Sequence, residues 1–251
     1  MKTKDLIIQL DISKEAARKS GDYLLKNKSY LNKKIVEDLK DIKLKADINS
    51  EILIKEIINS MSSYPILAEE SGKSEDELGD VFWVIDPLDG TANYNRGIPI
   101  CCVSIGLIKN MKPLLGVIYD FDNDHMYVGG KFNSCSTMND NPIRVSDIKN
   151  KEDSILITGL PHSSDFSDKS LSKMIKDMQT WKKVRMIGSA AIAACYIASG
   201  KAERYEEKGV YLWDIIAGAA IVSSAGGIAE ITNIRENFQV DVSFSNSNIK
   251  D

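Results

Sequence analysis

Two long amphipathic patterns open the chain and predict helices. Apolar side chains recur at helical spacing over residues 3–27, with lysines and acids between them. Residues 28–46 are rich in lysine and weakly patterned, which favours a hairpin or a loop. A second helix should begin near Asp47, with Asp47 or Asn49 as its cap. The positions expected to face the core are Ile7, Leu10, Ala17, Leu24 and Leu25 in the first helix, and Ile54, Ile57, Ile58 and Met61 in the second.

Short apolar runs between turn-forming residues predict strands in the middle of the chain. They cover residues 66–68, 81–85, 98–108, 113–119 and 125–129. The last two runs are separated by Asp120, Asp122 and Asp124, which resemble a calcium loop. Because the required glycine and distal glutamate are missing, we interpret these acids as a hairpin turn.

After about residue 150 strands and helices alternate, which is typical of α/β units. Ser189 follows Gly188 and should cap a helix of small residues. Such a turn leaves backbone N–H groups free to hold a phosphate. Asp214 lies in the first turn of a further helix. Strands are expected at 154–158, 202–207, 228–231 and 240–244, and a helix at 168–180 with Leu171, Ile175 and Met178 inward.

The feature richest in chemistry is the sequence from Trp83 to Thr91, WVIDPLDGT. A buried strand ends there in two carboxylates, Asp86 and Asp89, which are costly to bury without a partner. Gly90 permits a left-handed backbone or the close approach of a ligand. Strand, paired acids and helix start together predict a site for a divalent cation and a phosphate. A surface turn is the alternative, because Pro-x-Asp-Gly also forms turns.

Acids also follow two other predicted strands. Glu69 and Glu70 come after the strand at 66–68, and Glu206 and Glu207 end the strand at 202–207. Ligands usually bind at the carboxyl ends of strands in an α/β sheet. We therefore expect Glu69 and Glu70 near the binding site, on the same side of the sheet as the acids that follow the strand at 81–85.

The composition limits the possible partners. The chain of 251 residues has 43% hydrophobic and 27% charged residues, as an ordinary globular protein does. Its net charge of −4 provides no basic surface for nucleic acid or an anionic membrane. No apolar stretch approaches the length of a membrane span, and the N-terminus lacks a signal-peptide core. We expect neither a nucleic-acid nor a membrane partner.

The cysteines indicate a reducing compartment. No CxxC pair occurs and only two histidines are present, so a zinc site is not expected. Cys101 and Cys102 are neighbours in an apolar run and should face opposite sides of a strand. With Cys135 and Cys195, we interpret them as reduced thiols in or near the core of a cytoplasmic protein.

Four separated motifs together resemble the inositol monophosphatase family of magnesium-dependent, lithium-sensitive phosphatases. DGT alone would be weak evidence, but the ordered set is specific, and the similarity runs from about residue 5 to the C-terminus. The motifs are Ala68-Glu69-Glu70-Ser71, WVIDPLDGTANYNRGIP, Gly188-Ser189-Ala190-Ala191 and Trp213-Asp214-Ile215-Ile216-Ala217-Gly218.

The patterns predict an α/β fold whose N-terminal part is α+β, and the resemblance implies a layered αβαβα sandwich. We expect one phosphatase domain over 1–251, with a metal-binding subdomain at about 1–145 and a substrate-side subdomain at 146–251. The resemblance also implies a homodimer.

The resemblance implies a ligand set for two to three Mg²⁺ ions. Glu69, Asp86 and the carbonyl oxygen of Leu88 would bind the first ion. Asp86, Asp89 and Asp214 would bind the second, so that Asp86 bridges the two. Glu69 would help to hold a weaker third ion. Oxygen ligands suit magnesium, and paired ions can activate water and stabilise a leaving oxygen.

Catalytic and substrate-binding roles follow in the same way. Glu69 and Thr91 would orient the attacking water, and Asp47 would pair with Thr91. The chain departs from the family pattern at Ala46, where threonine is usual; this bears on water positioning and not on the metal site. The residues that match phosphate and substrate contacts are Gly90, Thr91, Gly188, Ser189, Ala190 and Asp214, with Glu207 as a ligand of sugar hydroxyls.

We expect a phosphomonoesterase that hydrolyses inositol monophosphate or a similar polyol or sugar phosphate with metal-activated water. A 3'(2'),5'-bisphosphate nucleotidase is one alternative, although the Lys-Glu-Phe that typically follows its DGT is absent. Fructose-1,6-bisphosphatase is another. Haloacid-dehalogenase phosphatases need Asp-x-Asp, whereas two residues separate Asp86 from Asp89. A binding protein without activity is disfavoured, because every expected metal ligand is present.

Overall fold

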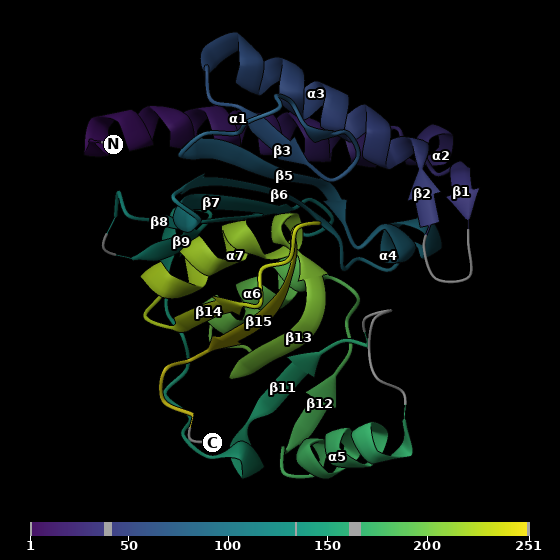
Figure 1. Ribbon diagram of the computed structural model, residues 1–251, viewed down its shortest axis with the longest axis vertical. Coiled ribbons are helices and arrows are strands. Elements are labelled where there is room, and N and C mark those ends of the chain that lie inside the picture. The colour runs from purple at the N-terminus through teal and green to yellow at the C-terminus, as the bar shows by residue number, and fades with distance from the viewer. Residues whose placement is uncertain (1, 38–41, 134, 161–166, 250–251) are drawn as a thin grey trace.

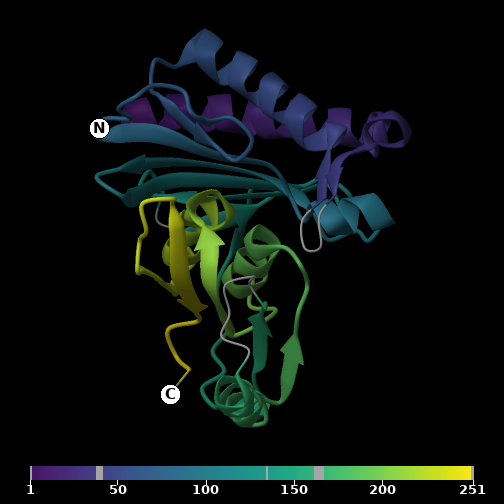
Figure 2. The same ribbon diagram turned by 45° about the vertical axis from the view of Figure 1, so that its right-hand side comes forward.

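Helices and sheets alternate in five layers (Figure 1). The computed structural model describes residues 2–37, 42–133, 135–160 and 167–249. The view turned by 45° shows the same order of layers (Figure 2), which confirms the αβαβα arrangement. From the top of Figure 1 the layers are α1 (Thr3–Lys26) with α3 (Lys45–Met61), an eight-stranded sheet, α6 (Ala190–Ala198) with α7 (Leu212–Ser224), a five-stranded sheet, and α5 (Asp168–Met178).

The eight-stranded sheet has the order β10-β9-β8-β7-β6-β5-β3-β4, and only β3 and β5 run parallel. The strand expected at 98–108 begins only at Cys102, and β4, β9 and β10 were not predicted because two or three residues carry no readable pattern. The strands are β3 (Ile66–Ala68), β4 (Gly72–Lys73), β5 (Val81–Asp89), β6 (Cys102–Lys109), β7 (Lys112–Asp120), β8 (His125–Gly130), β9 (Ser136–Met138) and β10 (Asn141–Ile143).

The five-stranded sheet has the order β12-β11-β13-β15-β14, with β11 parallel to β12 and β13. Strand β13 pairs with β15 and therefore extends beyond its predicted end at residue 207. Glu206 and Glu207 therefore lie within the strand and not at its end, contrary to the sequence pattern. The strands are β11 (Ile155–Thr158), β12 (Lys183–Arg185), β13 (Arg204–Tyr211), β14 (Ile228–Thr232) and β15 (Gln239–Ser245); the 3₁₀ turn η1 (Lys151–Asp153) precedes β11.

The lysine-rich segment after α1 forms a short helix, α2 (Lys28–Leu31), and a hairpin of β1 (Lys34–Glu37) and β2 (Ile42–Leu44). The hairpin was expected and the helix was not. Asp47 does not cap α3 as expected, because the helix already begins at Lys45. Its Oδ2 atom instead accepts a hydrogen bond of 2.6 Å from the Leu44 N–H. One Asp47 oxygen is thereby fixed by the helix start.

Two hydrophobic clusters fill the spaces on either side of the eight-stranded sheet. Trp83 and Ile85 of β5 join the cluster under α1 and α3, while Val84 joins the cluster that contains α6 and α7. Cys101 and Cys102 divide between the two clusters in the same way, as strand alternation predicts. All four cysteines are free thiols.

Some predicted core positions are exposed. Ile7 and Leu25 of α1 are 46% and 38% exposed, while their neighbours Leu6 and Leu24 are buried. Only one residue of each adjacent apolar pair can face the sheet, and periodicity alone did not identify which. Met61, at the end of α3, is 45% exposed.

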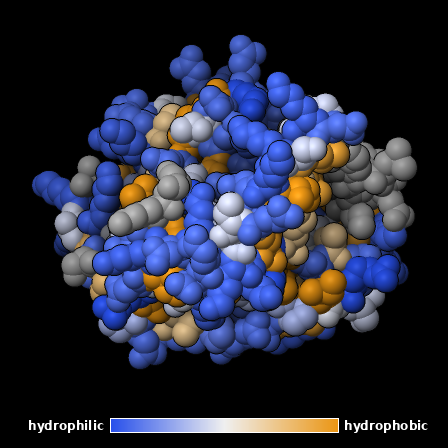
Figure 3. Space-filling view, turned by 90° about the horizontal axis from the view of Figure 1, so that it is seen from below, coloured by the Kyte–Doolittle hydropathy of each residue, from blue (hydrophilic) through white to orange (hydrophobic). Residues whose placement is uncertain are grey.

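Helix α5 was expected to bury three apolar side chains, but none of its residues is buried. Ile175 is 49% exposed, and Leu171 and Met178 are only partly covered. The helix is the outermost layer of the fold (Figures 1 and 2), so no further layer covers it. The face seen from below is largely hydrophilic, with separate small hydrophobic groups (Figure 3). Among the described helices, none is long and apolar enough to cross a membrane.

Glycines let α7 lie very close to the eight-stranded sheet. A Cβ atom on Gly116 of β7 would be 2.2 Å from the carbonyl oxygen of Ala217, and one on Gly106 of β6 would be 2.5 Å from Ile216 Cγ2. Side chains at either position would push the helix away. The start of α7, which carries Asp214, is thereby brought to the sheet.

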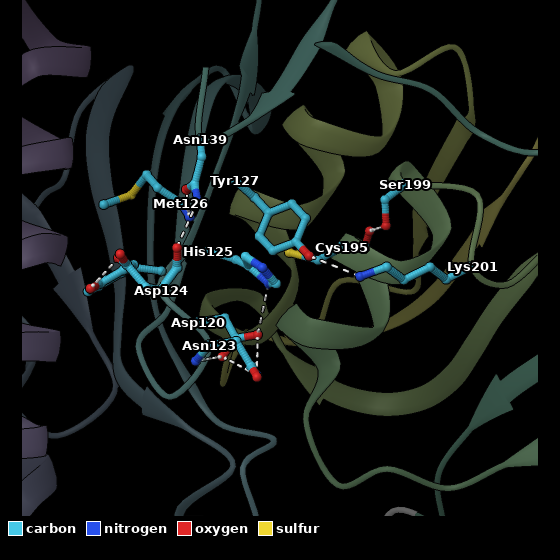
Figure 4. A network of polar contacts seen from close by, with 11 residues as sticks. Asp120, Asn123, Asp124, His125, Met126, Tyr127, Asn139, Cys195, Ser199 and Lys201 are labelled. Atoms are coloured by element: carbon cyan, nitrogen blue, oxygen red, sulfur yellow. Dashed lines mark hydrogen bonds and ion pairs between the residues drawn. The ribbon is translucent and has the colours of Figure 1, made fainter. Parts of the chain in front are cut away.

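A polar network joins the β7–β8 hairpin to the residues after α6 (Figure 4). Asp120, which is 3% exposed, accepts hydrogen bonds of 3.0 Å at each oxygen from Asn123 Nδ2, and His125 Nδ1 lies 3.9 Å away. The Tyr127 hydroxyl lies 3.5 Å from Lys201 Nζ. The hydrogen bonds from Asn123 satisfy the buried Asp120 carboxylate. The segment that contains Asp120, Asp122 and Asp124 is the hairpin turn that the sequence indicated.

Candidate active site

The acids of β5 share one face because the strand ends in a bulge. Asp86 pairs with Ser104 of β6 and Asp89 pairs with Cys102, with a register shift between the two pairs. In a regular strand the two aspartates would face opposite sides, but the extra residue turns both toward the face that Ser104 and Cys102 share. Contrary to the predicted proline turn, β5 continues to Asp89. The bulge is therefore what pairs the carboxylates.

Gly90 follows directly and needs to be glycine. Its φ is +88°, and a Cβ atom there would lie 2.7 Å from the Ile100 carbonyl oxygen. The residue precedes the short helix α4 (Thr91–Arg96). The chain therefore turns sharply after Asp89, which brings Thr91 beside the two acids.

Glu69 lies at the end of β3, next to β5. The Glu69 N–H donates to the Ile85 carbonyl at 3.1 Å, and the next residue is held on both sides. Glu51 of α3 accepts a hydrogen bond from the Glu70 N–H at 2.8 Å, and Lys43 of β2 forms an ion pair with the Glu70 carboxylate. These contacts attach the Glu69 segment to α3 and to the β1–β2 hairpin.

Asp214 reaches the same region from far along the chain. Its Oδ2 atom accepts a hydrogen bond of 2.8 Å from the Tyr211 N–H at the start of α7. Asp214 therefore takes part in capping α7. This contact occupies one carboxylate oxygen and does not prevent a second role.

The four acids act on one another electrostatically. Burial raises the pKa of Glu69, Asp86, Asp89 and Asp214, and the charge of a neighbouring acid raises it further for Glu69, Asp86 and Asp214. Glu69 is exposed as a whole residue although protein surrounds its carboxyl group. Because the residue as a whole is exposed, we expect a smaller rise of the pKa there than at Asp86, which is 2% exposed.

This donor set fits a hard divalent cation. It offers carboxylates and the Leu88 carbonyl, and such a cation would remove the repulsion that raises the pKa values. Within the described part of the chain, no three His, Cys, Asp or Glu side chains are gathered into a closed metal cage. The acids are therefore neighbours that a cation would have to draw together.

Asp89 is fixed by the start of α6. Its Oδ2 atom accepts hydrogen bonds from the Ser189 hydroxyl at 2.5 Å and from the Ala191 N–H at 2.7 Å. Ser189 also caps the helix, as predicted, by accepting from the Ile192 N–H at 3.2 Å. The positive end of the helix dipole favours the charged form of this carboxylate. The hydroxyl expected to contact substrate is thus engaged with a neighbouring acid.

Thr91 joins Asp47 to the end of β5. Its hydroxyl lies 2.8 Å from Asp47 Oδ1 and 3.0 Å from the Leu88 carbonyl oxygen. Asp47 is 2% exposed, and burial raises its pKa to about 7, although the Leu44 N–H and the Thr91 hydroxyl oppose the rise. The pair that the resemblance implied is therefore in hydrogen-bond contact.

A cavity of about 480 Å³ opens beside these acids. Its size is in the range of small-molecule sites. Burial raises the pKa of Glu207 to about 7, against a hydrogen bond of 3.0 Å from the Tyr205 hydroxyl. The lining includes, among the residues predicted from sequence, Asp89, Gly188, Ser189, Ala190, Glu207 and Asp214.

Other lining residues were not predicted as site residues, among them Asn93, Tyr205 and Gly159. Asn93 Nδ2 donates to the carbonyls of Ile100 and Ile187, each at 2.8 Å, and so ties α4 to the Gly188 turn. Tyr205 could have been found, because residues two apart on a strand share a face. Gly159 carries no local signal in the sequence, because the side chain that it contacts, Glu207, is 48 residues away.

Known proteins are similar to this chain in sequence and in architecture. A model of the inositol monophosphatase family matches residues 9–247. The protein named Nus factor SuhB from Xylella fastidiosa is 32% identical over 222 residues, covering 87% of this chain and 80% of its own. The fructose-1,6-bisphosphatase/inositol-1-monophosphatase of Aquifex aeolicus is 33% identical over 223 residues, covering 87% and 84%. The structure of inositol monophosphatase from Anabaena superposes with a TM-score of 0.81 at 33% identity, covering 96% and 92%.

The fold and these similarities define the class of the protein as a phosphoric monoester hydrolase. Within that class the chain belongs to the inositol monophosphatase family, whose members are generally metal-dependent. The resemblance drawn from four motifs is confirmed.

Proposed function

We propose that the protein is a Mg²⁺-dependent phosphomonoesterase that acts on the monophosphate of an uncharged polyol, such as inositol. The observation that carries the proposal is a group of four acids that act on one another electrostatically, two of which, Asp89 and Asp214, line a cavity together with Glu207. The acids suit a metal-bound phosphate, and Glu207 suits the hydroxyl groups of the polyol.

Glu69, Asp86, Asp89, Asp214 and the Leu88 carbonyl would hold two to three Mg²⁺ ions. When bound, the ions supply positive charge for the phosphate oxygens and lower the pKa of a bound water. The chain itself orients that water. Because Thr91 donates its hydroxyl proton to Asp47, the lone pairs on Thr91 Oγ1 can accept a hydrogen bond from the water. Glu69 would help on the opposite side.

Asp47 suits the role of proton acceptor behind Thr91. A pKa of about 7 lies near the operating pH, where a general base works best. The backbone of Gly90 and Thr91 would contact the phosphate, and Gly188 and Ala190 would border the polyol. Ser189 would act by holding Asp89, because its hydroxyl already donates to that carboxylate.

Charge favours a monophosphate over the two bisphosphate alternatives. The described lining of the cavity contains Asp89, Glu207 and Asp214 but no lysine, arginine or histidine. A second phosphate placed beside Glu207 would meet negative charge without a described cation to balance it. The name of the Aquifex relative includes fructose-1,6-bisphosphatase, so that activity has to be measured directly.

The test is a turnover panel with inositol 1-phosphate, fructose 1,6-bisphosphate and adenosine 3',5'-bisphosphate across a Mg²⁺ titration. We expect the highest kcat/KM for the monophosphate and no turnover after chelation. Thr91→Ala should lower kcat by about 100-fold or more, while Thr180→Ala, at an exposed position just after α5, serves as the matched control. Inactivity on all three substrates would overturn the proposal, and preference for a bisphosphate would select that alternative.

The remaining expectations are tested with the same protein. Lithium inhibition is measured in the turnover assay, and the homodimer by sedimentation. These properties, the cytoplasmic location and the division into subdomains at 1–145 and 146–251 stay predictions.

A further inference from the structure

We infer that Tyr205, together with Gly159, positions the Glu207 carboxylate and so sets the selectivity of the cavity for hydroxyl-bearing leaving groups. The inference rests on the proposed phosphatase function. Tyr205 is a positioning residue here, because its hydroxyl acts through Glu207 and not on the phosphate.

Tyr205 belongs to β13, the central strand of the five-stranded sheet. Tyr205 of β13 pairs with Ile157 of β11 and with Phe244 of β15, and its ring packs on that of Phe244 at 6.0 Å between centroids. The side chain is 1% exposed. Burial raises the pKa of Tyr205 far above its usual value, so the hydroxyl stays protonated and can only donate to a carboxylate.

Tyr205 and Glu207 lie two residues apart and therefore on the same face of β13. The Tyr205 hydroxyl donates to Glu207 Oε2 at 3.0 Å. Among the described residues, none donates a hydrogen bond to Oε1. One oxygen is therefore fixed by the phenol, and the other is available to a ligand hydroxyl in the cavity.

Gly159 limits the carboxylate from the other side. A Cβ atom at this position would lie 2.3 Å from Glu207 Cδ, Oε1 and Oε2 alike, so the whole carboxylate rests against the glycine. Gly159 and Glu207 also line the same cavity. Tyr205 and Gly159 together hold the Glu207 carboxylate in one orientation. Because its conformational freedom is already restricted in the free protein, the carboxylate loses little side-chain entropy when it binds a ligand hydroxyl.

The experiment compares two substrates in the presence of Mg²⁺. Inositol 1-phosphate carries hydroxyl groups on its leaving group, whereas p-nitrophenyl phosphate carries none. For Tyr205→Phe we expect the ratio of their kcat/KM values to fall about tenfold, mainly through KM for inositol 1-phosphate, as for loss of one hydrogen bond to a charged group. Tyr127→Phe, which removes a hydroxyl from a buried tyrosine outside the cavity, should leave the ratio at its wild-type value.

Two further variants keep the test decisive if Tyr205→Phe folds poorly. Gly159→Ala should lower the same ratio without altering the sheet interior, because the new methyl group displaces the carboxylate. In a cycle with Glu207→Ala, which removes the acceptor, the double variant Tyr205→Phe/Glu207→Ala should be no worse than Glu207→Ala alone, since Tyr205 acts through Glu207.

The outcomes separate the inference from the function on which it rests. A wild-type protein that hydrolyses neither substrate overturns both. An active wild type whose substrate ratio is unchanged in Tyr205→Phe and Gly159→Ala overturns the positioning role alone. Additive effects of Tyr205 and Glu207 would do the same.

Discussion

Replacing Ser189 by alanine tests how the two halves of the site are joined. The Ser189 hydroxyl is the donor in a 2.5 Å hydrogen bond to Asp89 Oδ2 and the acceptor for the Ile192 N–H. Ser189 and Asp89 are 5% and 9% exposed, so water cannot freely replace the lost group. If Ser189 served only as a substrate contact, its removal would not affect folding beyond the helix cap.

The expected loss of stability has two parts. A hydrogen bond to a buried charged group contributes roughly 1.5–3 kcal/mol, and loss of a serine helix cap costs about 1 kcal/mol. Ser189→Ala should therefore lower the free energy of unfolding by about 2.5–4 kcal/mol at pH 8. The loss should shrink at low pH, because protonation of Asp89 removes the charge that strengthens the bond.

The assay is urea unfolding of the chelator-treated protein, followed by tryptophan fluorescence. Ser167→Ala is the matched control, because Ser167 caps α5 by accepting from the Ser170 N–H at 3.3 Å. That variant should lose at most about 1 kcal/mol. Equal losses for Ser189→Ala and Ser167→Ala at pH 8 would refute the anchoring of Asp89 by Ser189.

Three further perturbations give distinct results. Asp47 and Glu207 have folded-state pKa values of about 7, above the usual value near 4 in an unfolded chain. Their contribution to the free energy of unfolding is complete below the unfolded pKa and is lost as the pH rises through 7. The metal-free protein should therefore be roughly 2–4 kcal/mol less stable at pH 8 than at pH 5 by urea unfolding, and a higher stability at pH 8 would contradict these values. Asp86→Asn should stabilise the metal-free protein at pH 8 by about 1–3 kcal/mol while abolishing phosphate release, because one of four repelling charges is removed; destabilisation would count against the repulsion. Gly116→Ala should lower the free energy of unfolding by about 3 kcal/mol or more, because its methyl group would lie 2.2 Å from the Ala217 carbonyl oxygen. Calorimetry should show a lower melting temperature; an unchanged one would show that α7 can move away.

Sequence patterns identified the residues of the candidate site that lie close together in the chain. Asp86, Asp89, Gly90 and Thr91 form one continuous motif at the end of an apolar run, so the run and the chemistry of the side chains were enough to name them as candidates. The same reasoning placed the end of β13 too early, although Glu207 lines the cavity, because an apolar pattern does not reveal that pairing with β15 carries β13 on to Tyr211.

The local side-chain environment was beyond sequence reasoning for a different reason. Ser189 was assigned to substrate from its motif, but its hydroxyl meets an acid 100 residues earlier in the chain. Gly159 carries no signal until β11 and β13 lie side by side. Contacts of this kind depend on strand register and layer packing, which are set by the whole chain.

By itself the sequence determined the family, the alternation of helices and strands, and the acids from which the site is built, because these depend on residue type, order and local periodicity. Only the tertiary structure decided how those acids are used. The bulge at the end of β5 turns Asp86 and Asp89 to one face, and the glycines under α7 bring Asp214 to them. Both effects arise from the close packing of backbone segments that are distant in the chain, and no local pattern encodes that distance.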